Sequence, residues 1–296
     1  METRDLEYVL AVHLHGGIGR AAEVLGLTQP ALSKAIQRVE ALIGVPLFER
    51  TATGMTPTHA GALFIQRAKR IHLEYEDVLK EMQGLKTGEQ GVLRIGYSPS
   101  IPTGLIIGAC RQIIKERPVA RLRISGKFAR DLIDMLNDGN LDLVIVPLPE
   151  NRLADFRVWE LFSDRLAVMA DDSHPLHQRR NLGLSDLADQ EWLLPSSQFN
   201  IRQQVEYAFR LKGLPPPALR IEIDFGGTFL FNLIRGTRML AIGGAEASGA
   251  ILGFRPLDLR QDELNLRRMV GIMARRGAYL SPLAERMIVL LEQHVA

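Results

Sequence analysis

A short run of hydrogen-bonding side chains near the N-terminus has the residue types and spacing needed to contact nucleic acid. After Thr28 the apolar residues recur every three or four positions, which predicts a helix from about Gln29 with one buried face. Thr28 can cap this helix, and Pro30 is tolerated because first-turn amides have no partner within the helix. The buried face comprises Leu32, Ala35, Ile36, Val39, Leu42 and Ile43. The side chains left outside are of kinds that reach base edges and phosphates: Gln29, Pro30, Ser33, Lys34 and Gln37.

Side chains that could support catalysis or bind a metal form no recognisable constellation. The sequence has no G-x-S-x-G element, no phosphate-binding glycine loop ending in Lys-Ser or Lys-Thr, and no H-E-x-x-H pair. His174 and His177 lie in a turn without a nearby cysteine, and the adjacent Asp171 and Asp172 are typical of a solvated turn. Cys110 is the sole cysteine, so a buried structural thiol is expected rather than a disulfide or a redox sensor. We therefore expect neither an enzyme nor a metal or other cofactor.

Length and composition describe an ordinary globular protein. The 296 residues are 46% hydrophobic and 24% charged, which suits two or three domains. No run of about 18 apolar residues is present, so no membrane-spanning helix is expected. The opening residues, METRDLEYVL, are charged where a signal peptide would be basic and then apolar. The sequence therefore predicts a cytoplasmic protein.

The charge balance of the N-terminal segment does not by itself indicate DNA binding. Residues 1–90 contain ten Lys and Arg against eleven Asp and Glu, and five of those acids lie between Glu74 and Glu89. Residues 1–73 are mildly basic, with eight Lys and Arg against six Asp and Glu. DNA binding must therefore come from local geometry, and the polar helix face alone is explained equally well as a solvated surface.

The residues around the polar helix supply such a geometry. IGRAAEVLG, at residues 18–26, predicts a short helix with buried alanines that ends at Gly26, where a positive φ is easily adopted. With the helix from Gln29 this is typical of a helix-turn-helix, whose second helix lies in the major groove. VPLFER, TATG and MTPTH then predict two short strands around a turn at Gly54, which indicates a winged motif.

This segment resembles the DNA-binding domain of the bacterial LysR-type transcriptional regulators. The similarity rests on Ala21-Ala22, QPALS at residues 29–33, G-x-PLF-x-R at residues 44–50, and the THAG that follows. It departs at the wing turn, Ala52-Thr53-Gly54-Met55, which lacks a basic residue, and at residues 17–19, where Gly-Ile-Gly replaces helix-starting hydroxyl residues. The resemblance implies DNA contacts from Arg20, Thr28, Gln29, Pro30, Ser33, Lys34, Gln37 and Arg50. Only the cations Arg20, Lys34 and Arg50 are expected at phosphates, so the DNA affinity should depend weakly on salt.

A proline-free stretch after the predicted wing has the pattern of a dimerisation helix. From Thr58 to about Lys86, apolar residues recur at alternating spacings of four and three over three heptads. The seam consists of Phe64, Ala68, Ile71, Tyr75, Val78, Met82 and Leu85. This narrow stripe favours pairing with a second copy, and a homodimer presents two recognition helices to a pseudo-palindromic site. The resemblance identifies the stretch with the family's linker helix and implies a homodimer or homotetramer.

A polar break, KTGEQG at residues 86–91, precedes a segment with α/β organisation. The predicted buried strands VLRIGY, LRIS and LDLVIVP alternate with helices at 102–116 and 129–137. After RVWELF and RLAVMA the pattern repeats, which indicates a second α/β lobe. That repeat comprises a helix near 185–190, strand WLLP, a helix at 200–211, strand LRIEID, a helix at 228–235 and strand MLAIG. A strand at 266–274 and a helix at 282–292 follow.

The resemblance implies how these parts form domains. The fold class is α/β: a winged helix-turn-helix at residues 1–60, a linker helix at 58–88, and a two-lobed effector domain at 91–296. The effector domain is expected to have type 2 periplasmic-binding-protein-like architecture, in which the chain crosses between the lobes twice. Lobe one then comprises 91–163 and 265–296, and lobe two comprises 164–264.

Three loops of the α/β segment lie where strands end and helices begin, which is where α/β proteins bind ligands. Their hydroxyls, amides and glycines suit a small molecule, and an anion in particular. The resemblance places effector contacts in these loops and adds a wall near Lys127. The expected effector residues are Ser98, Pro99, Ser100, Lys127, Phe128, Ser196, Ser197, Phe199, Arg202, Gly226, Gly227 and Thr228. An ordinary helix cap explains each loop equally well, and Lys127 and Arg202 are more often solvated charges.

Three functions fit this order of domains. A solute-binding protein would need an export signal, and an enzyme would need a reactive constellation; the sequence has neither. We therefore interpret the chain as a sequence-specific, DNA-binding transcriptional regulator that responds to a small-molecule effector between the two lobes. Lobe closure would alter the dimer geometry and the spacing of the recognition helices. The resemblance also implies RNA polymerase as a partner, and no membrane partner is expected.

Overall fold

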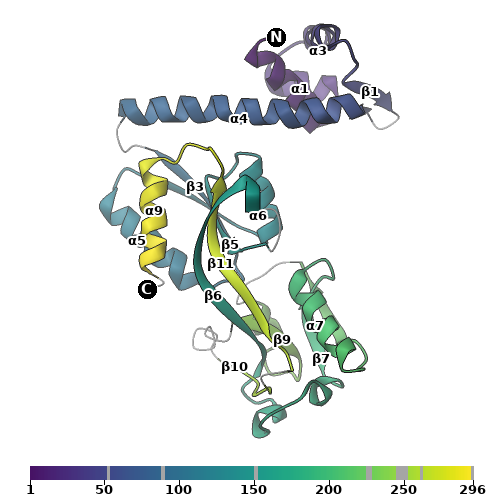
Figure 1. Ribbon diagram of the computed structural model, residues 1–296, viewed down its shortest axis with the longest axis vertical. Helices are drawn as coiled ribbons and strands as arrows, with labels where there is room; N and C mark the ends of the chain where they lie inside the picture. The colour runs from purple at the N-terminus through teal and green to yellow at the C-terminus, as the bar shows by residue number, and fades with distance from the viewer. Residues whose placement is uncertain are drawn as a thin grey trace. The chain divides into compact units, whose positions relative to one another are not determined.

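The computed structural model describes residues 1–51, 54–87, 91–149, 153–224, 229–244, 253–260 and 263–294. The chain divides into two units, Met1–Thr87 and Gly88–Ala296, and each is considered by itself (Figure 1). Every helix within the described residues is too short or too polar to cross a lipid bilayer.

The first unit is a winged helix-turn-helix followed by a long helix, as the sequence predicted. Its elements are α1 (Thr3–His15), α2 (Ile18–Leu25), α3 (Gln29–Ile43), β1 (Phe48–Thr51), β2 (Gly54–Pro57) and α4 (His59–Thr87). The Thr28 hydroxyl caps α3 by accepting a hydrogen bond from the Ala31 amide at 3.4 Å, and α2 ends at Gly26 with φ of 65°. One hydrophobic core joins the helices, the wing and the start of α4; it contains Val9, Val12, Ala21, Ala22, Leu32, Ile36, Val39, Leu47, Phe48 and Ile65.

The last turn of α3 departs from the predicted buried face. Leu42 and Ile43 share the helical spacing of the core residues, yet they are 64% and 37% exposed. Val39 is the last residue of α3 that belongs to the core, and the chain turns away at Gly44, where φ is 81°. The periodicity therefore continues for one turn beyond the surface that it packs against.

Close backbone packing fixes the start of α4 against the wing. The Thr58 amide donates to the Leu47 carbonyl at 3.0 Å, and the Thr58 hydroxyl accepts from the Gly61 amide at 2.9 Å. A Cβ atom on Gly61 would lie 1.8 Å from the Leu47 carbonyl oxygen, so this approach requires glycine. The THAG segment is thus the cap and the contact surface at which α4 begins.

The second unit is built on one mixed β-sheet covered by helices. Its helices are α5 (Thr103–Glu116), α6 (Ala129–Asn137), α7 (Asn200–Leu211), α8 (Phe229–Ile234) and α9 (Pro282–Gln293), with short 3-10 helices η1 (Leu153–Asp155), η2 (Pro175–Gln178) and η3 (Leu184–Leu187). Its strands are β3 (Val92–Tyr97), β4 (Arg121–Gly126), β5 (Leu143–Pro147), β6 (Phe156–Asp171), β7 (Glu191–Pro195), β8 (Ala218–Ile223), β9 (Leu240–Gly244), β10 (Phe254–Pro256) and β11 (Leu266–Arg275). The strand order is β4-β3-β5-β11-β6-β9-β7-β8, and β10 pairs with β6.

Two long antiparallel strands, β6 and β11, run side by side between the two halves of this unit (Figure 1). Near one end, β11 pairs with β5 through residues 270–273. Near the other end, β6 pairs with β9 through residues 166–169. The chain therefore leaves the first half along β6 and returns along β11, which confirms the double crossing that the resemblance implied.

Each half has its own hydrophobic core. We call lobe one the half in which α5, α6 and α9 pack around β3 and β5, and lobe two the half in which α7 and α8 pack around β7 and β9. In lobe two the rings of Trp192 and Phe209 meet edge to face, with their centroids 6.0 Å apart. The paired strands β6 and β11 contribute residues to the cores of both lobes.

Three elements of the second unit differ from their predictions. The LRIS segment forms an edge strand, β4, whose residues are mostly exposed because a terminal strand has a neighbour on one side only. RVWELF and RLAVMA are parts of one strand, β6, because the polar residues between them stay paired with β11. The helix expected near 185–190 is the short η3, after which the chain enters β7 at Glu191.

Candidate functional site

The first two turns of α3 present polar side chains to solvent. Gln29, Pro30, Lys34 and Gln37 are exposed, and Ser33 is half-buried. The opposite face of the helix carries Leu32, Ala35, Ile36 and Val39 into the core. The buried residues therefore fix α3 against the hydrophobic core of the first unit, and the helix holds its polar side chains toward solvent.

A hollow beside α3 brings together residues from α2, α3, β1 and β2. Its volume is about 280 Å³, and it is lined by Ile18, Gly19, Gln29, Ser33, Arg50, Thr51, Gly54 and Met55. Arg50, on β1, thus lies with Gln29 and Ser33, although the rest of α3 and the turn after it separate them in the sequence. Arg20 is exposed on α2 and does not line this hollow. The arrangement is a concave surface of mixed polar and apolar residues with a cation, Arg50, at its wing side.

The wing is held by a contact that the sequence did not reveal. The Met55 amide donates to the Gly16 carbonyl at 3.0 Å, so β2 is tied to the turn after α1. Gly54 has φ of 129°, and a Cβ atom there would lie 2.4 Å from the Gly16 oxygen. The expected wing residues Ala52 and Thr53 lie outside the described residues. The wing position thus depends on glycine on both sides of this contact.

The guanidinium of Arg38, on the later part of α3, pairs with Asp5 of α1. Asp5 is buried and also accepts a hydrogen bond from the Glu2 amide at 2.8 Å. Burial alone would raise the pKa of Asp5, but the Glu2 amide and the Arg38 guanidinium outweigh it and hold the pKa below its ordinary value. Arg38 therefore joins α1 to α3.

The predicted seam of α4 divides into a core part and an exposed part. Ala68 is buried and Phe64 packs against the core of the first unit. Further along α4, four seam side chains are 43–52% exposed: Ile71, Tyr75, Val78 and Met82. The side chain of Leu85 lies outside the described residues. The exposed part is an apolar stripe at heptad spacing, whereas the first two seam positions serve the chain's own core.

In lobe one, the loop Ser98-Pro99-Ser100 is more constrained than the sequence suggested. Ser98 is buried, its amide donates to the Ile145 carbonyl at 3.0 Å, and its hydroxyl lies 2.9 Å from that of Ser100. The amide is therefore not free, contrary to the expectation for an anion site. Arg268 of β11, which the sequence did not single out, donates to the Ser100 hydroxyl at 3.1 Å and to the Ser100 carbonyl at 2.5 Å.

Arg268 also links this loop to the crossing strands. Its guanidinium donates to the buried carboxylate of Asp164 on β6 at 2.6 and 2.8 Å, and these two residues are paired in the register of β6 and β11. The Ser100 contacts are thus made by a side chain of β11, one of the two strands that join the lobes. In the sequence, Arg268 is a charged residue next to the apolar run of β11. Strand periodicity alone predicts that such a residue faces solvent.

A second loop of lobe one meets lobe two through an aromatic contact. Lys127 is exposed, and Phe128 is the residue immediately before α6. Phe199 is the residue immediately before α7, and the rings of Phe128 and Phe199 lie with their centroids 4.3 Å apart at 46°. Pro99 lies near this loop, because a Cβ atom on Gly126 would be 3.6 Å from Pro99 Cγ. The structure therefore brings together two of the three expected loops and the expected wall near Lys127.

The expected polar residues of lobe two take different positions. Ser196 is half-buried and its amide donates to the Ile223 carbonyl at 3.0 Å, while Ser197 is exposed. Arg202 is only 7% exposed, so it is not the solvated charge that its type suggests, and it pairs with Glu206 one turn along α7. Within the described residues its Nη1 atom has no hydrogen-bond partner. Gly226, Gly227 and Thr228 lie outside the described residues.

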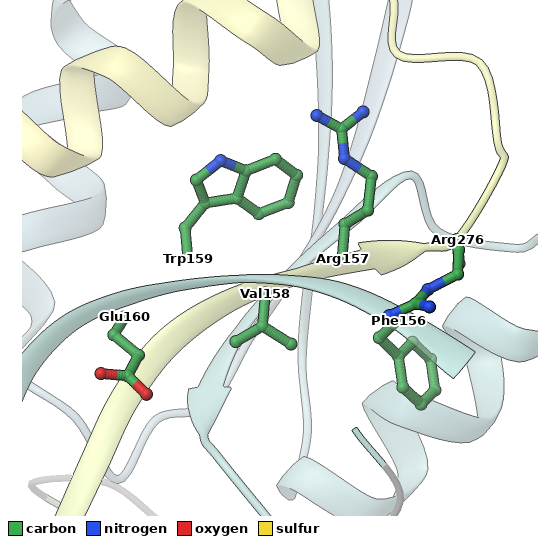
Figure 2. A pocket seen from close by; sticks show the side chains of 6 residues that line it. All are labelled: Phe156, Arg157, Val158, Trp159, Glu160 and Arg276. Carbon is green, nitrogen blue, oxygen red and sulfur yellow. The ribbon is translucent and has the colours of Figure 1, made fainter. Parts of the chain in front are cut away.

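A further hollow lies on β6 at a place that the sequence did not single out. It has a volume of about 670 Å³ and is lined by Phe156, Arg157, Val158, Trp159, Glu160 and Arg276 (Figure 2). Arg157 and Trp159 project from one face of the strand and the guanidinium lies 5.0 Å from the indole centroid, while Val158 and Glu160 project from the other. Five of the lining residues are consecutive, at 156–160, so the hollow follows β6. None of the lining residues belongs to the loops that meet near Phe128 and Phe199.

The residues considered for metal or redox chemistry have structural partners. His174 is buried, with Nε2 3.1 Å from the Arg238 carbonyl, and its Nδ1 accepts from the Leu176 amide at 3.1 Å. Asp171, expected in a solvated turn, is buried and accepts from the Gly236 amide at 2.9 Å. Burial raises the pKa of the Cys110 thiol, which lies in the lobe one core. No group of three metal-ligating side chains forms within the described ranges.

Comparison with known proteins identifies both units. Residues 3–62 match the family described as "Bacterial regulatory helix-turn-helix protein, lysR family", and residues 86–296 match the "LysR substrate binding domain". OxyR of Escherichia coli, a DNA-binding transcriptional dual regulator, is 31% identical over 206 residues, which cover 69% of this chain and 67% of OxyR. YybE of Bacillus subtilis, an HTH-type transcriptional regulator, is 27% identical over 96% of both chains.

A solved structure shows the same fold over the whole chain. Full-length CbnR in complex with its target DNA aligns with a TM-score of 0.63 at 20% identity, covering all of both chains. Such a low identity supports the fold, while the two family matches cover the winged helix-turn-helix and the two-lobed unit. The chain therefore belongs to the LysR family of DNA-binding transcriptional regulators, with an effector-binding domain in its second unit.

Proposed function

We propose that this regulator binds a dyad-symmetric DNA site by placing α3 of two copies in successive major grooves. The observation that carries the proposal is the exposed polar front of α3 beside the hollow that it shares with Arg50. A helix with glutamine and lysine side chains at its front suits the major groove, where glutamine pairs with adenine and lysine with guanine. The fold likeness to CbnR, which was solved with its target DNA, supports the proposal.

The roles of the individual residues follow from their positions. Base edges are contacted by Gln29, Ser33, Lys34 and Gln37, with Pro30 packed at the same surface and Thr28 fixing the start of the helix. Phosphates are contacted by Arg20, Lys34 and Arg50, which are all exposed cations. Because Arg38 is paired with Asp5, it is not assigned to DNA. So few phosphate contacts give a shallow dependence of affinity on salt.

The two copies are joined through α4. The exposed stripe of Ile71, Tyr75, Val78 and Met82 has the heptad spacing that packs against an identical helix, and a solvent-facing apolar stripe is costly in a monomer. The proposed division of the chain is 1–60 for DNA binding, 58–88 for dimerisation and 91–296 for effector binding. Within the last, lobe one takes 91–163 and 265–296, and lobe two takes 164–264.

The effector binds between the lobes, at the loops around Ser98, Phe128 and Phe199. These loops are supplied by both lobes and meet at the ends of their strands, which is the position where α/β domains bind small molecules. A ligand that contacts both lobes changes the angle between them, because β6 and β11 are the strands that join them. The dimer transmits this change to the spacing of the two α3 helices.

The remaining assignments accompany this function. The protein acts in the cytoplasm as a regulator without a catalytic role, and it needs no metal or organic cofactor. RNA polymerase is its partner at promoters. A peroxide switch based on two cysteines is not proposed, because Cys110 is the sole cysteine of the sequence.

Selection of bound duplexes from a random DNA library by the full-length protein tests the proposal. We expect a dyad-symmetric sequence at physiological salt, and the double variant Ser33→Ala/Lys34→Ala should lose affinity for it by at least tenfold. Gln66→Ala/Arg67→Ala is the matched control, because it removes one polar and one cationic side chain from the exposed surface of α4. Recovery of no common sequence, or equal losses in both variants, would contradict the assignment of α3.

A further inference from the structure

An aromatic contact joins the two lobes of the second unit beside the expected effector loops. The rings of Phe128 and Phe199 lie 4.3 Å apart between centroids, although Phe128 precedes α6 in lobe one and Phe199 precedes α7 in lobe two. Both residues are half-buried. Beside them, Arg130 of lobe one approaches the Gln198 side chain of lobe two to 3.5 Å. Two loops from different lobes therefore meet through an apolar contact with a weak polar one at its edge.

Two strands, β6 and β11, make the covalent connection between the lobes. Residues 163–165 of β6 lie between two stretches of this strand. The stretch before them pairs with β11 beside lobe one, and residues 166–169 pair with β9 of lobe two. The register of β6 against β11 shifts between Val270 and Gly271, as it does at a β-bulge. Bending of these two strands changes the lobe angle, and the Phe128–Phe199 contact resists any bend that separates the loops.

We propose that Phe128 and Phe199 form an aromatic latch that holds the two lobes at one angle, and that the effector acts by separating the two rings. The inference rests on the proposed effector site between the lobes and names the contact that regulates it. An aromatic pair shifts an equilibrium about 2- to 10-fold. The latch is thus strong enough to favour one lobe angle and weak enough for a small ligand to release it.

The latch predicts what an effector must offer. A ligand that enters between the loops removes the contact between the two phenylalanine rings. A flat, unsaturated group on the ligand compensates for this loss, because it can pack on the ring that has become exposed. Removal of either ring without ligand should have the same structural effect as binding. Phe128→Ala and Phe199→Ala are therefore expected to act alike, although they lie in different lobes.

The distance between the lobes provides the test. Nitroxide labels on Lys115→Cys and Leu211→Cys, exposed positions on α5 and α7, report this distance by pulsed electron paramagnetic resonance in the full-length protein carrying Cys110→Ser. We expect one main distance in the parent. Phe128→Ala or Phe199→Ala should lower the ratio of this population to a longer-distance one by about 2- to 10-fold. Phe199→Tyr keeps the ring and should restore the parent distribution.

A second aromatic pair within lobe two serves as the matched control. Phe231 and Phe254 meet at 5.3 Å, so Phe254→Leu disturbs packing without touching the contact between the lobes. Unchanged distances in both alanine variants, or an equal change in Phe254→Leu, would overturn the latch. Titration of the selected DNA duplex with the same proteins separates the two proposals. If the parent binds DNA but the distances do not change, only the latch fails; if the distances change without any DNA binding, only the DNA-binding proposal fails.

Discussion

Glu263 is predicted to be a major source of stability for lobe two. Its side chain is 4% exposed and accepts hydrogen bonds from the Leu184 amide at 3.0 Å, Arg260 Nη2 at 2.6 Å and Lys212 Nζ at 3.2 Å. The pKa of Glu263 falls to about 2, chiefly because of the Leu184 amide, and the two cations add to the effect while burial opposes it. The carboxylate thus joins η3, the residue after α7 and Arg260, and it holds them most strongly while it is ionised.

The magnitude follows from this pKa. An ordinary glutamate titrates near 4.5, and each pKa unit corresponds to about 1.4 kcal/mol, so ionisation of Glu263 stabilises the fold by roughly 3 kcal/mol. Water screens the cations, because the side chains of Arg260 and Lys212 are 51% and 43% exposed. Glu263→Gln keeps an acceptor but loses the charge. We therefore expect it to lower the free energy of unfolding by roughly 2–3 kcal/mol at pH 7.

Tryptophan fluorescence during urea denaturation measures this loss. Trp159 and Trp192 are the two tryptophans of the chain, and both lie in the second unit, so the signal reports its unfolding. Because the folded pKa of Glu263 lies below the unfolded value, its contribution is present in full above about pH 4.5 and is lost as the pH falls toward 2. The difference between parent and variant should shrink over that range.

An exposed glutamate of the same unit provides the control for Glu263. Glu292→Gln, at an exposed position of α9, is the matched control and should change the free energy of unfolding by less than about 0.5 kcal/mol. If Glu263→Gln is equally mild at pH 7, or if its effect is the same at pH 3 and pH 7, the ionised carboxylate does not stabilise lobe two as argued.

Two further predictions concern the first unit. Ile71→Glu places a charge in the exposed seam of α4 and should convert the dimer to monomers in sedimentation equilibrium, with a loss of DNA affinity; an intact dimer would show that the seam is not the interface. Gly54→Ala combines φ of 129° with a Cβ position 2.4 Å from the Gly16 oxygen, so it should destabilise the wing by roughly 1–3 kcal/mol and weaken DNA binding in titrations. Gly26→Ala is its control, because Gly26 also has a positive φ but no atom lies within 4 Å of the position of its added Cβ. Equal losses of stability and DNA affinity in the two variants would rule out the wing contact.

Local signals in the sequence predicted most elements because their physical causes are local. The Thr28 hydroxyl marks the start of α3 because it accepts a hydrogen bond from the Ala31 amide, three residues further along the chain. Gly26 marks the end of α2 through its own backbone angle. Leu42 was wrongly predicted to be buried, because helical spacing indicates which face of the helix a residue lies on but not how far the neighbouring core extends.

The single long strand β6 could not be predicted for a different reason. Ser163, Asp164 and Arg165 interrupt the apolar runs, and polar residues between two strands indicate a turn. Asp164 is nevertheless buried, because Arg268 on β11 neutralises it across the strand pair. A buried charge is identified by its partner, and this partner lies more than a hundred residues further along the chain.

The candidate site shows the same division between local and distant causes. Each effector loop was recognisable alone, because a polar or glycine-containing segment between a strand and a helix is a local pattern. The contacts of these loops are made by residues far away in the sequence: Arg268 of β11 donates to the Ser100 hydroxyl, and Phe199 of lobe two packs on Phe128 of lobe one. The sequence assigned Ser98 and Ser100 to a free anion site, whereas the structure makes them part of a network reaching the crossing strands. We therefore expect a ligand that binds there to compete with these contacts, and competition with the Phe128–Phe199 contact is what would allow it to change the angle between the lobes.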